Sequence, residues 1–325
     1  MKAAILNILR NRQAPVSGET LSDALGISRV SIWKHIQKLK EHGYRIEAAA
    51  IGYRLLKCPD APFPWEFYGR SERIAYYPEI GSTMDAAKRL AREGCAPMTV
   101  VVAGKQTEGR GRLQRPWFSD PGGLYFTMVL RPAVPVIESF KIGFLASVTM
   151  ARTVREKTGV DARVKWPNDI LVGDAKLCGM LVEMEAETDR VIFLNIGMGM
   201  NVNNDPSGLE PSATSLKALV GGEVSRTSLL AAFLDTFEKR LEQVQLDRVV
   251  DEWKALTMTI GRAVRVVTAN DEISGIAENI DDSGALMVRQ AGGAIRRVIY
   301  GDCFVQEKLS QGIERDKLRD SGIEE

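Results

Sequence analysis

The densest group of chemically useful side chains is the short stretch GKQTEGRGRLQRPW, residues 104–117. Three glycines and three arginines crowd it: Gly104, Gly109, Gly111, Arg110, Arg112 and Arg115. Arginine side chains form bidentate hydrogen bonds with phosphate or carboxylate oxygens, and glycines let backbone N–H groups approach the same anion. A flexible basic surface loop is the alternative, although Gln106 and Trp117 bracket the stretch with groups suited to ligand recognition. The spacing is neither GxxxxGK[ST] nor strand–GxGxxG–helix, so a Walker loop or dinucleotide fold is not expected.

Beyond residue 60 the chain contains no histidine, since His35 and His42 are its only two. The four cysteines lie far apart and without CxxC spacing, at Cys58, Cys95, Cys178 and Cys303. A Ser–His or Cys–His nucleophile pair, a zinc site and a disulfide framework are therefore not expected. An enzyme built from this part of the chain would work by positioning, electrostatics, lysine, arginine and carboxylates, with no metal held by protein side chains.

Four further motifs accompany the Gly/Arg stretch, namely EIGSTMDAAK (79–88), KWPNDI (165–170), KLCGMLVE (176–183) and GMGMNVN (197–203). Together with GRGRLQRPW they resemble the motifs of the biotin–protein ligases, in that family's order and at compatible spacing. With residues 1–60 the resemblance covers nearly the whole chain, and it points to the bifunctional members that also repress transcription. Two positions depart from the pattern: Gln114 stands where many relatives have glycine, and Met84 where many have a polar residue.

The resemblance implies two chemical steps. Biotin and ATP, with Mg²⁺, give biotinyl-5'-adenylate and pyrophosphate, and a lysine of a biotin carboxyl carrier domain then attacks the activated carbonyl. The implied catalytic groups are Lys176, Asp169 and Arg112. The implied biotin-binding residues are Ser82, Thr83, Met84, Gln106, Arg110, Gly111, Arg112 and Lys176. Those implied for the adenylate or ATP are Gly109, Arg110, Arg112, Arg115, Lys165, Asn168 and Asn201.

Several of these residues also have a plainer interpretation. Asp169 could orient or deprotonate the incoming amine, or it could simply cap a turn. Lys176 could offset the repulsion between carboxylate and α-phosphate, or be a solvated charge in a hairpin. Trp117 is treated as part of the core. The arginine-rich loop is expected to order over the adenylate and exclude water.

Periodicity in residues 66–260 predicts an α+β catalytic domain, with a mixed, largely antiparallel sheet. The resemblance implies a class II synthetase-like arrangement. Strand-like runs are expected at 74–80, 99–105, 124–131, 170–172, 177–184 and 191–200, and helices at about 84–93, 138–158 and 226–245. Gly173 and Asp174 are expected to form the turn of the hairpin that carries Lys176.

Residues 1–60 read as helix, helix, tight Gly turn, helix and hairpin, the pattern of a winged helix-turn-helix DNA-binding domain. Gly26 is expected to end the second helix, and Ser28 to cap the third, whose core stripe is Ile32, Ile36 and Leu39. The expected DNA-facing residues are Ser28, Arg29, Ser31, Lys34, Gln37 and Lys38. This segment holds ten Lys/Arg against five Asp/Glu, whereas the rest holds 33 against 37. A small protein-interaction domain is the alternative.

The remaining segments complete the organisation of the chain. Residues 57–65 hold three prolines and read as a linker, 261–308 as an SH3-like C-terminal β-barrel, and 309–325 as a flexible tail. No run of eighteen apolar residues exists, so a cytoplasmic protein without membrane contact is expected. The resemblance implies a homodimer when liganded, bound to operator DNA. A non-catalytic biotin-sensing repressor and a lipoate–protein ligase of the same fold are the rivals.

Overall fold

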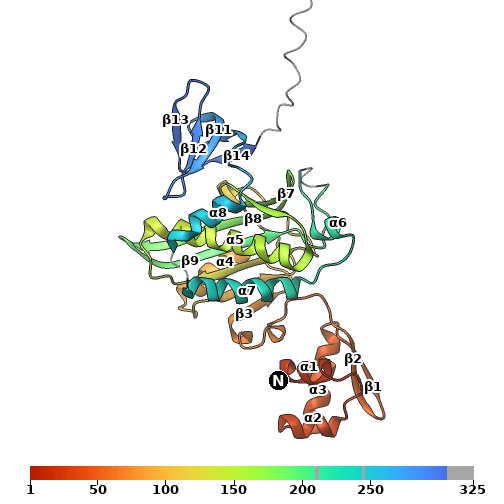
Figure 1. The fold of residues 1–325 in the computed structure, drawn as a ribbon. Coiled ribbons are helices and arrows are strands. Elements are labelled where there is room, and N and C mark those ends of the chain that lie inside the picture. Colours follow the sequence, from red (N-terminus) through yellow and green to blue (C-terminus); the bar gives the residue numbers. More distant parts are fainter. Residues whose placement is uncertain (209–211, 244–245, 306–325) are drawn as a thin grey trace, which may run out of the picture.

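The computed structural model describes residues 1–208, 212–243 and 246–305. The chain forms three units in a row, with the helical head at one end, a large sheet-and-helix domain in the middle and a small β domain at the other end (Figure 1). This α+β arrangement agrees with the expected organisation. Within the described ranges no helix is long and apolar enough to cross a membrane. The expected tail at 309–325 lies outside the described residues.

The head is a winged helix-turn-helix. It consists of α1 (Lys2–Arg10), α2 (Gly18–Leu25), α3 (Arg29–Glu41) and the antiparallel hairpin β1 (Arg45–Ala49) and β2 (Gly52–Lys57). Gly26 ends α2 with a left-handed backbone, φ +64°, and the Ser28 hydroxyl accepts a hydrogen bond from the Ser31 amide at 3.2 Å. Both features orient α3, because they fix the turn that joins it to α2.

The central domain is built on a seven-stranded sheet in the order β3-β4-β5-β9-β8-β7-β6. Only the β3–β4 pair is parallel, so the mixed, largely antiparallel sheet is confirmed. The strands are β3 (Ile74–Tyr77), β4 (Thr99–Ala103), β5 (Leu124–Leu130), β6 (Ala162–Lys165), β7 (Asp169–Val172), β8 (Ala175–Glu187) and β9 (Arg190–Met200).

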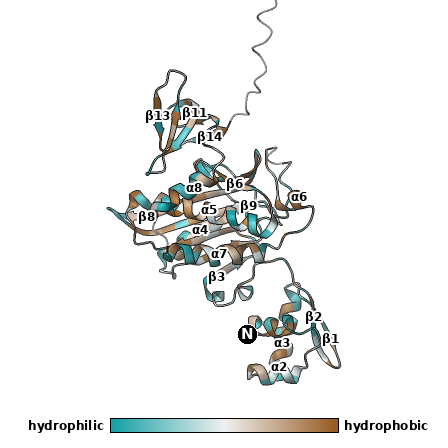
Figure 2. Cartoon of the chain, viewed as in Figure 1, coloured by the Kyte–Doolittle hydropathy of each residue, from teal (hydrophilic) through white to brown (hydrophobic). Residues whose placement is uncertain are grey.

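Helices cover both faces of this sheet, as alternation along the buried strands requires. In β4, Val100 and Val102 face a large cluster with α5 (Ser139–Thr158), α7 (Arg226–Gln243) and α8 (Val249–Leu256). Val101 faces the other side, against α4 (Thr83–Arg92). In Figure 2 hydrophilic and hydrophobic residues alternate along these helices, as expected for helices with one buried face. The expected strands and helices are all present, with ends that shift by up to three residues.

Apart from the 3-10 helices, four short elements among the described residues have no counterpart in the sequence interpretation. They are β6, α6 (Leu216–Val220), α8 and the last strand, β14 (Asp302–Val305). Three of them have only four or five residues, which is too short for a 2.0 or 3.6 period to stand out. Strand β6 nevertheless matters for function, because it leads directly into the KWPND motif.

The expected linker is packed rather than free. Asp60 accepts hydrogen bonds from the backbone amide and side chain of Arg226 at the start of α7, at 2.8 and 2.7 Å. Phe63 and Trp65 stack on each other, and both meet the edge of His42 at the end of α3. Residues 58–63, between the end of β2 and the 3-10 helix Pro64–Glu66, form no regular helix or strand, and individual side-chain contacts hold them in place.

The C-terminal domain is an antiparallel sheet in the order β13-β12-β11-β10-β14. Its first four strands are β10 (Ala263–Val267), β11 (Glu272–Ile280), β12 (Leu286–Arg289) and β13 (Ile295–Val298), all within the segment expected to form a β domain. The turn before β12 contacts the central domain, where the Gly284 carbonyl accepts a hydrogen bond from the Trp166 indole at 3.0 Å. The KWPND motif is therefore attached to the C-terminal domain.

We expect Asp281→Asn to destabilise the protein by about 1–2 kcal/mol at pH 7. Burial opposes the charge of Asp281, but hydrogen bonds from Ser283, Arg297 and the Ala285 amide outweigh it and lower its pKa to about 2. A carboxylate with a lowered pKa stabilises the fold above its unfolded pKa, and this contribution is lost as the pH falls toward 2. Urea unfolding should show the variant and parent converging below about pH 4. Asp282→Asn, at the exposed neighbouring position, is the control. A difference in unfolding free energy between Asp281→Asn and the parent that did not change with pH would contradict this explanation.

Candidate active site

The predicted ligand-binding motifs meet in one cavity of about 500 Å³. Its walls come from the start of α4, the Gly/Arg loop (residues 109–117) and the KWPND turn between β6 and β7. Strands β8 and β9 and residues 302–304 of the C-terminal domain complete them. Thirteen of the predicted ligand-site and catalytic residues line it, in the order Ser82, Thr83, Met84, Gln106, Arg110, Gly111, Arg112, Arg115, Lys165, Asn168, Asp169, Lys176 and Asn201. The motifs are far apart in sequence, so their convergence follows from the sheet order.

At one end of the cavity neutral side chains are closely hydrogen-bonded to one another, with the Arg110–Asp85 ion pair beside them. The Gln106 side-chain oxygen accepts hydrogen bonds from the Thr83 amide at 2.8 Å and its hydroxyl at 3.0 Å. The Thr127 hydroxyl donates to that of Thr83 at 2.9 Å, and Ser82 caps α4. Met84, the departure from the motif, is buried with its methyl group facing Gly197. This end can offer hydroxyl and amide groups to an uncharged polar ring.

Trp117 lies across two glycines in the middle of the cavity, and is not simply part of the core. Gly179 and Gly199 are register partners on β8 and β9. A Cβ on Gly199 would lie 2.6 Å from Trp117 Cε2, and one on Gly179 would lie 3.0 Å from Cζ3. The indole N–H is buried and has no hydrogen-bond partner among the described residues. A flat ring with an open donor suits contact with a planar ligand group.

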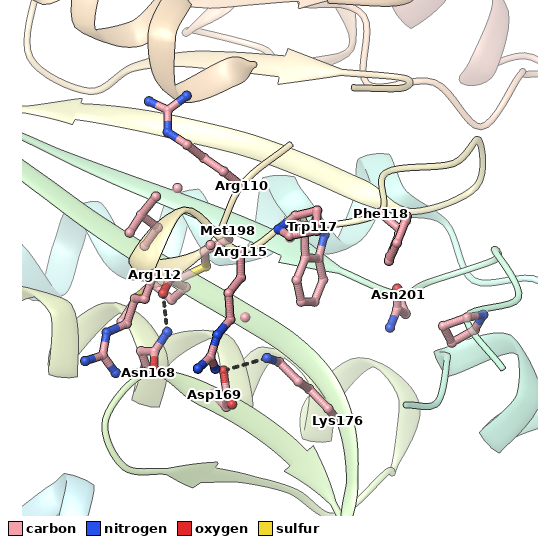
Figure 3. A pocket seen from close by; sticks show the side chains of 18 of the residues that line it. Arg110, Arg112, Arg115, Trp117, Phe118, Asn168, Asp169, Lys176, Met198 and Asn201 are labelled. Carbon is pink, nitrogen blue, oxygen red and sulfur yellow. Dashed lines mark hydrogen bonds and ion pairs between the residues drawn. The ribbon is translucent and has the colours of Figure 1, made fainter. Parts of the chain in front are cut away.

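The opposite end of the cavity is charged. Lys176 Nζ lies 3.2 Å from Asp169 Oδ1 and 5.3 Å from the centre of the Trp117 ring. Figure 3 shows Lys176 and Arg115 pointing toward Asp169 from two sides. Lys176 is thus a cavity-facing group rather than a solvated hairpin charge, and the Asp169 carboxylate pairs with it rather than capping a turn.

Arg112 and Arg115 both reach this charged end. Arg112 donates to the Asn168 side-chain oxygen at 3.3 Å and to the Gly301 carbonyl at 3.0 Å. Burial lowers the pKa of Arg112, while nearby carboxylates oppose that shift; an arginine still stays protonated at neutral pH. Arg115 pairs with Asp302 at 2.5 Å. Because the hydrogen-bond partners of Arg112 are neutral oxygens, and the carboxylates near it pair with Arg115 and Lys176, its positive charge remains available to an anion.

Arg110 differs from the other two arginines. Its guanidinium makes two hydrogen bonds to the Asp85 carboxylate, at 2.7 and 2.6 Å, and lies 3.6 Å from Glu183. In Figure 3 it points away from Arg112 and Lys176. Its assignment to biotin and the nucleotide stays a prediction, although the observed pairing gives this arginine another role.

Some site residues were not expected from the sequence. Thr127, Asn204 and Asp302 line the cavity, and Asn204 donates to the Asn201 side chain at 2.9 Å. Asn204 directly follows the GMGMNVN motif, so extending that motif by one polar residue would have found it. Gly109 is not in the cavity wall; a Cβ there would lie 2.5 Å from the Trp117 carbonyl, so it permits a close backbone crossing.

The head presents its predicted DNA-facing residues on α3. Arg29, Lys34 and Lys38 are exposed, Gln37 and Ser31 are half-buried, and Ser28 is the exposed cap. Val30 and Trp33 are also exposed, at 63% and 51%, and were not predicted to face outward. The helix thus offers cations for phosphates together with apolar groups that could contact base edges.

Comparison with known proteins agrees with all three units. Family models match an HTH domain at residues 2–54, the biotin/lipoate A/B protein ligase family at 76–203 and the biotin protein ligase C terminal domain at 259–306. The bifunctional ligase/repressor BirA of Bacillus subtilis is 36% identical over 302 residues, covering 88% of this chain and 93% of its own. That of Escherichia coli is 31% identical over 290 residues, covering 85% and 88%.

A solved structure extends the comparison to three dimensions. The biotin protein ligase from Aquifex aeolicus in complex with biotin and ATP has a TM-score of 0.61 and 25% identity, covering 72% of this chain and 98% of its own. This match leaves a little more than a quarter of the present chain uncovered. For comparison, the helical head occupies residues 1–57. The chain belongs to the biotin–protein ligase family, with the three domains of its bifunctional ligase/repressor members.

Proposed function

We propose that this protein is an ATP-dependent biotin–[acetyl-CoA-carboxylase] ligase that also represses transcription. It would form biotinyl-5'-adenylate and transfer biotin to a lysine of a biotin carboxyl carrier domain. The observation that carries the proposal is the single cavity with a neutral, hydroxyl-rich end at Thr83 and Gln106 and a cationic end at Lys176 and Arg112. Such a cavity suits a molecule with an uncharged polar ring and an acidic tail.

In the first step a biotin carboxylate oxygen attacks the α-phosphorus of ATP, and pyrophosphate leaves. Both reactants are anionic, so Lys176 and Arg112 would reduce their repulsion and stabilise the extra charge of the transition state. ATP enters as its magnesium complex. Proteins usually hold such an ion through one or two carboxylates and the substrate phosphates, and Asp169 and Asp302 line the cavity. The described residues hold no cluster of three metal-ligating side chains.

In the second step the neutral amine of the acceptor lysine attacks the acyl carbon. An amide C–N bond forms, the acyl C–O bond to AMP breaks, AMP leaves, and the proton of the amine passes to water. We infer that Asp169 orients that amine. The support is that its carboxylate faces the cavity and already lies 3.2 Å from another ammonium group, Lys176 Nζ. No covalent enzyme intermediate is needed. The Gly/Arg loop beside Trp117 would keep water from the mixed anhydride.

Incubation with biotin, MgATP and an isolated carrier domain tests the catalytic proposal. Biotin should appear on one lysine, AMP and pyrophosphate should form, and lipoate should not replace biotin. Transfer of lipoate instead would identify a lipoate–protein ligase. Tight binding of biotin without pyrophosphate release would identify a non-catalytic sensor.

The repressor function is proposed from the head. We infer that adenylate-bound protein forms a homodimer whose two α3 helices read a two-fold operator. A gel-shift assay with DNA from biotin synthesis promoters, with and without biotin and ATP, tests this. Ligand-dependent binding to these promoters would support it, and equal binding to unrelated DNA would contradict it.

We expect Lys34→Gln to weaken DNA binding uniformly across sequences and to reduce the slope of log K against log[salt] by about 1. Lys34 is exposed on α3, where a cation can displace one counterion from phosphate. Lys239→Gln, on the exposed side of α7 in the central domain, is the matched control. An unchanged salt slope for Lys34→Gln would place the DNA elsewhere.

A further inference from the structure

We propose that Arg110 and Asp85 form a latch that holds the Gly/Arg loop (residues 109–117) onto α4, and that Arg110 is a positioning residue rather than a ligand for the anion. The inference rests on the proposed biotin-binding function. It assigns roles to two carboxylates, Asp85 and Glu183, that the two chemical steps do not use.

The geometry of Arg110 is that of a fork-to-fork pair. Both terminal nitrogens donate to the two Asp85 oxygens, at 2.7 and 2.6 Å, and one also lies 3.5 Å from the Ser82 hydroxyl. The Arg110 side chain is only 19% exposed. The guanidinium holds the pKa of the Asp85 carboxyl below its usual value, mainly through these hydrogen bonds. A bidentate arginine–carboxylate pair fixes direction as well as distance.

Local charge disfavours an anion beside Arg110. Its one positive charge faces two carboxylates, Asp85 on α4 and Glu183 on β8. Phosphate or carboxylate brought to the same guanidinium would meet both of them. Arg112 also has two carboxylates nearby, Asp302 and Asp169, but these pair with Arg115 and Lys176. The hydrogen-bond partners of Arg112 itself are the neutral oxygens of Asn168 and Gly301. The two arginines of the GRGR motif therefore divide the work between holding the loop and binding the anion.

The latch connects the loop with the neutral end of the cavity. Asp85 lies in the first turn of α4, directly after Thr83 and Met84, which form that end. On the loop side the backbone is tied to itself, from the Gly111 amide to the Arg115 carbonyl and from the Trp117 amide to the Gly109 carbonyl, both at 2.8 Å. Fixing Arg110 therefore fixes the whole loop over the biotin end.

The two possible roles of Arg110 predict opposite effects of Asp85→Asn. As a latch residue, Arg110 loses its anchor, so biotin should dissociate about two- to fivefold faster, as expected for one ion pair whose carboxylate side chain is 56% exposed. As a ligand, Arg110 would be released toward biotin, and dissociation should slow. Stopped-flow dissociation of biotin alone from the full-length protein decides between them. Slower dissociation would overturn the proposal.

Further variants make the test specific. Arg110→Gln should match Asp85→Asn, the double variant should be no worse than either, and Asp85→Glu should restore slow dissociation. Additive losses in the double variant would overturn the pairing. Glu185→Gln, which breaks the Arg92–Glu185 pair between the same α4 and β8, is the matched control and should leave dissociation unchanged. If Glu185→Gln accelerated biotin dissociation as much as Asp85→Asn, the effect would come from any contact between α4 and β8, and the proposal would be overturned.

A ligand-free measurement separates the latch from the proposed function. Amide hydrogen exchange of residues 109–115 should be about two- to fivefold faster in Asp85→Asn and Arg110→Gln, and unchanged in Glu185→Gln. If the parent protein did not bind biotin, the proposed function would be contradicted. The exchange rates of residues 109–115 would still test the latch, because they are measured without ligand. Unchanged loop exchange in all variants would remove the latch.

Discussion

Replacing Lys176 by glutamine is expected to lower kcat/KM for adenylate formation by about 10²–10³. Lys176 is the ammonium group that faces both Asp169 and the Trp117 ring, in a cavity whose acidic substrates must approach each other. Glutamine keeps the length and a donor but removes the charge, so the loss should fall on the transition state more than on biotin affinity. Pyrophosphate release measured with saturating biotin gives the rate.

Two comparisons make the Lys176 result specific. Lys157→Gln, at an exposed position in the last turn of α5, should have parental activity. Biotin affinity, measured without ATP, should change far less than the rate in Lys176→Gln. A rate within threefold of the parent would show that the cationic end is not the reacting end.

Gly199→Ala is expected to reduce kcat/KM by about a hundredfold, the usual scale when reacting groups are displaced by about 1 Å. A Cβ at this position would lie 2.6 Å from Trp117 Cε2, so the indole must leave its place across β8 and β9. The strand itself should tolerate alanine, because φ at Gly199 is not in the left-handed region. Thermal unfolding should confirm that the variant is folded, and the adenylation assay gives the loss.

Gly197→Ala is the matched control for Gly199→Ala. It lies two residues away on the same face of β9 and also lines the cavity, but its added Cβ meets the methyl end of Met84 at 2.8 Å and the Thr127 hydroxyl at 3.3 Å, so a smaller loss, not parental activity, is expected. A flexible methionine can move where an indole wedged on two strands cannot. Equal losses in the two variants would mean that any side chain on this strand blocks the cavity, and that Trp117 has no special place.

The sequence predicted the order of elements well because long amphipathic patterns dominate it. Strands β4, β5, β8 and β9 are nearly continuous apolar or alternating runs, and helices α4, α5 and α7 have clear stripes. The cavity-lining motifs were found as well, since glycines, arginines and Lys176 stand out by type. The short β6 and the last strand, β14, were missed because four residues carry little periodicity.

What the sequence could not tell is which partner each side chain takes. Arg110 and Arg112 are two residues apart in one motif, yet one pairs with Asp85 and the other with Asn168. These partners lie 25 and 56 positions away, and only the packed sheet brings them near. The sequence could not show that Trp117 lies in the cavity for a similar reason. The two glycines that its ring covers, Gly179 and Gly199, come from β8 and β9, far from residue 117 in the sequence.

The Asp60–Arg226 contact also limits how the two halves of the protein can be separated. The Arg226 side chain is only 14% exposed, and Asp60 is its ion-pair partner. A ligase fragment that starts at the first residues of the central domain would leave a guanidinium enclosed without its counter-charge, which is more costly than losing a surface pair. A ligase fragment without the DNA-binding domain should therefore start before Asp60, so that it keeps the ion-pair partner of Arg226.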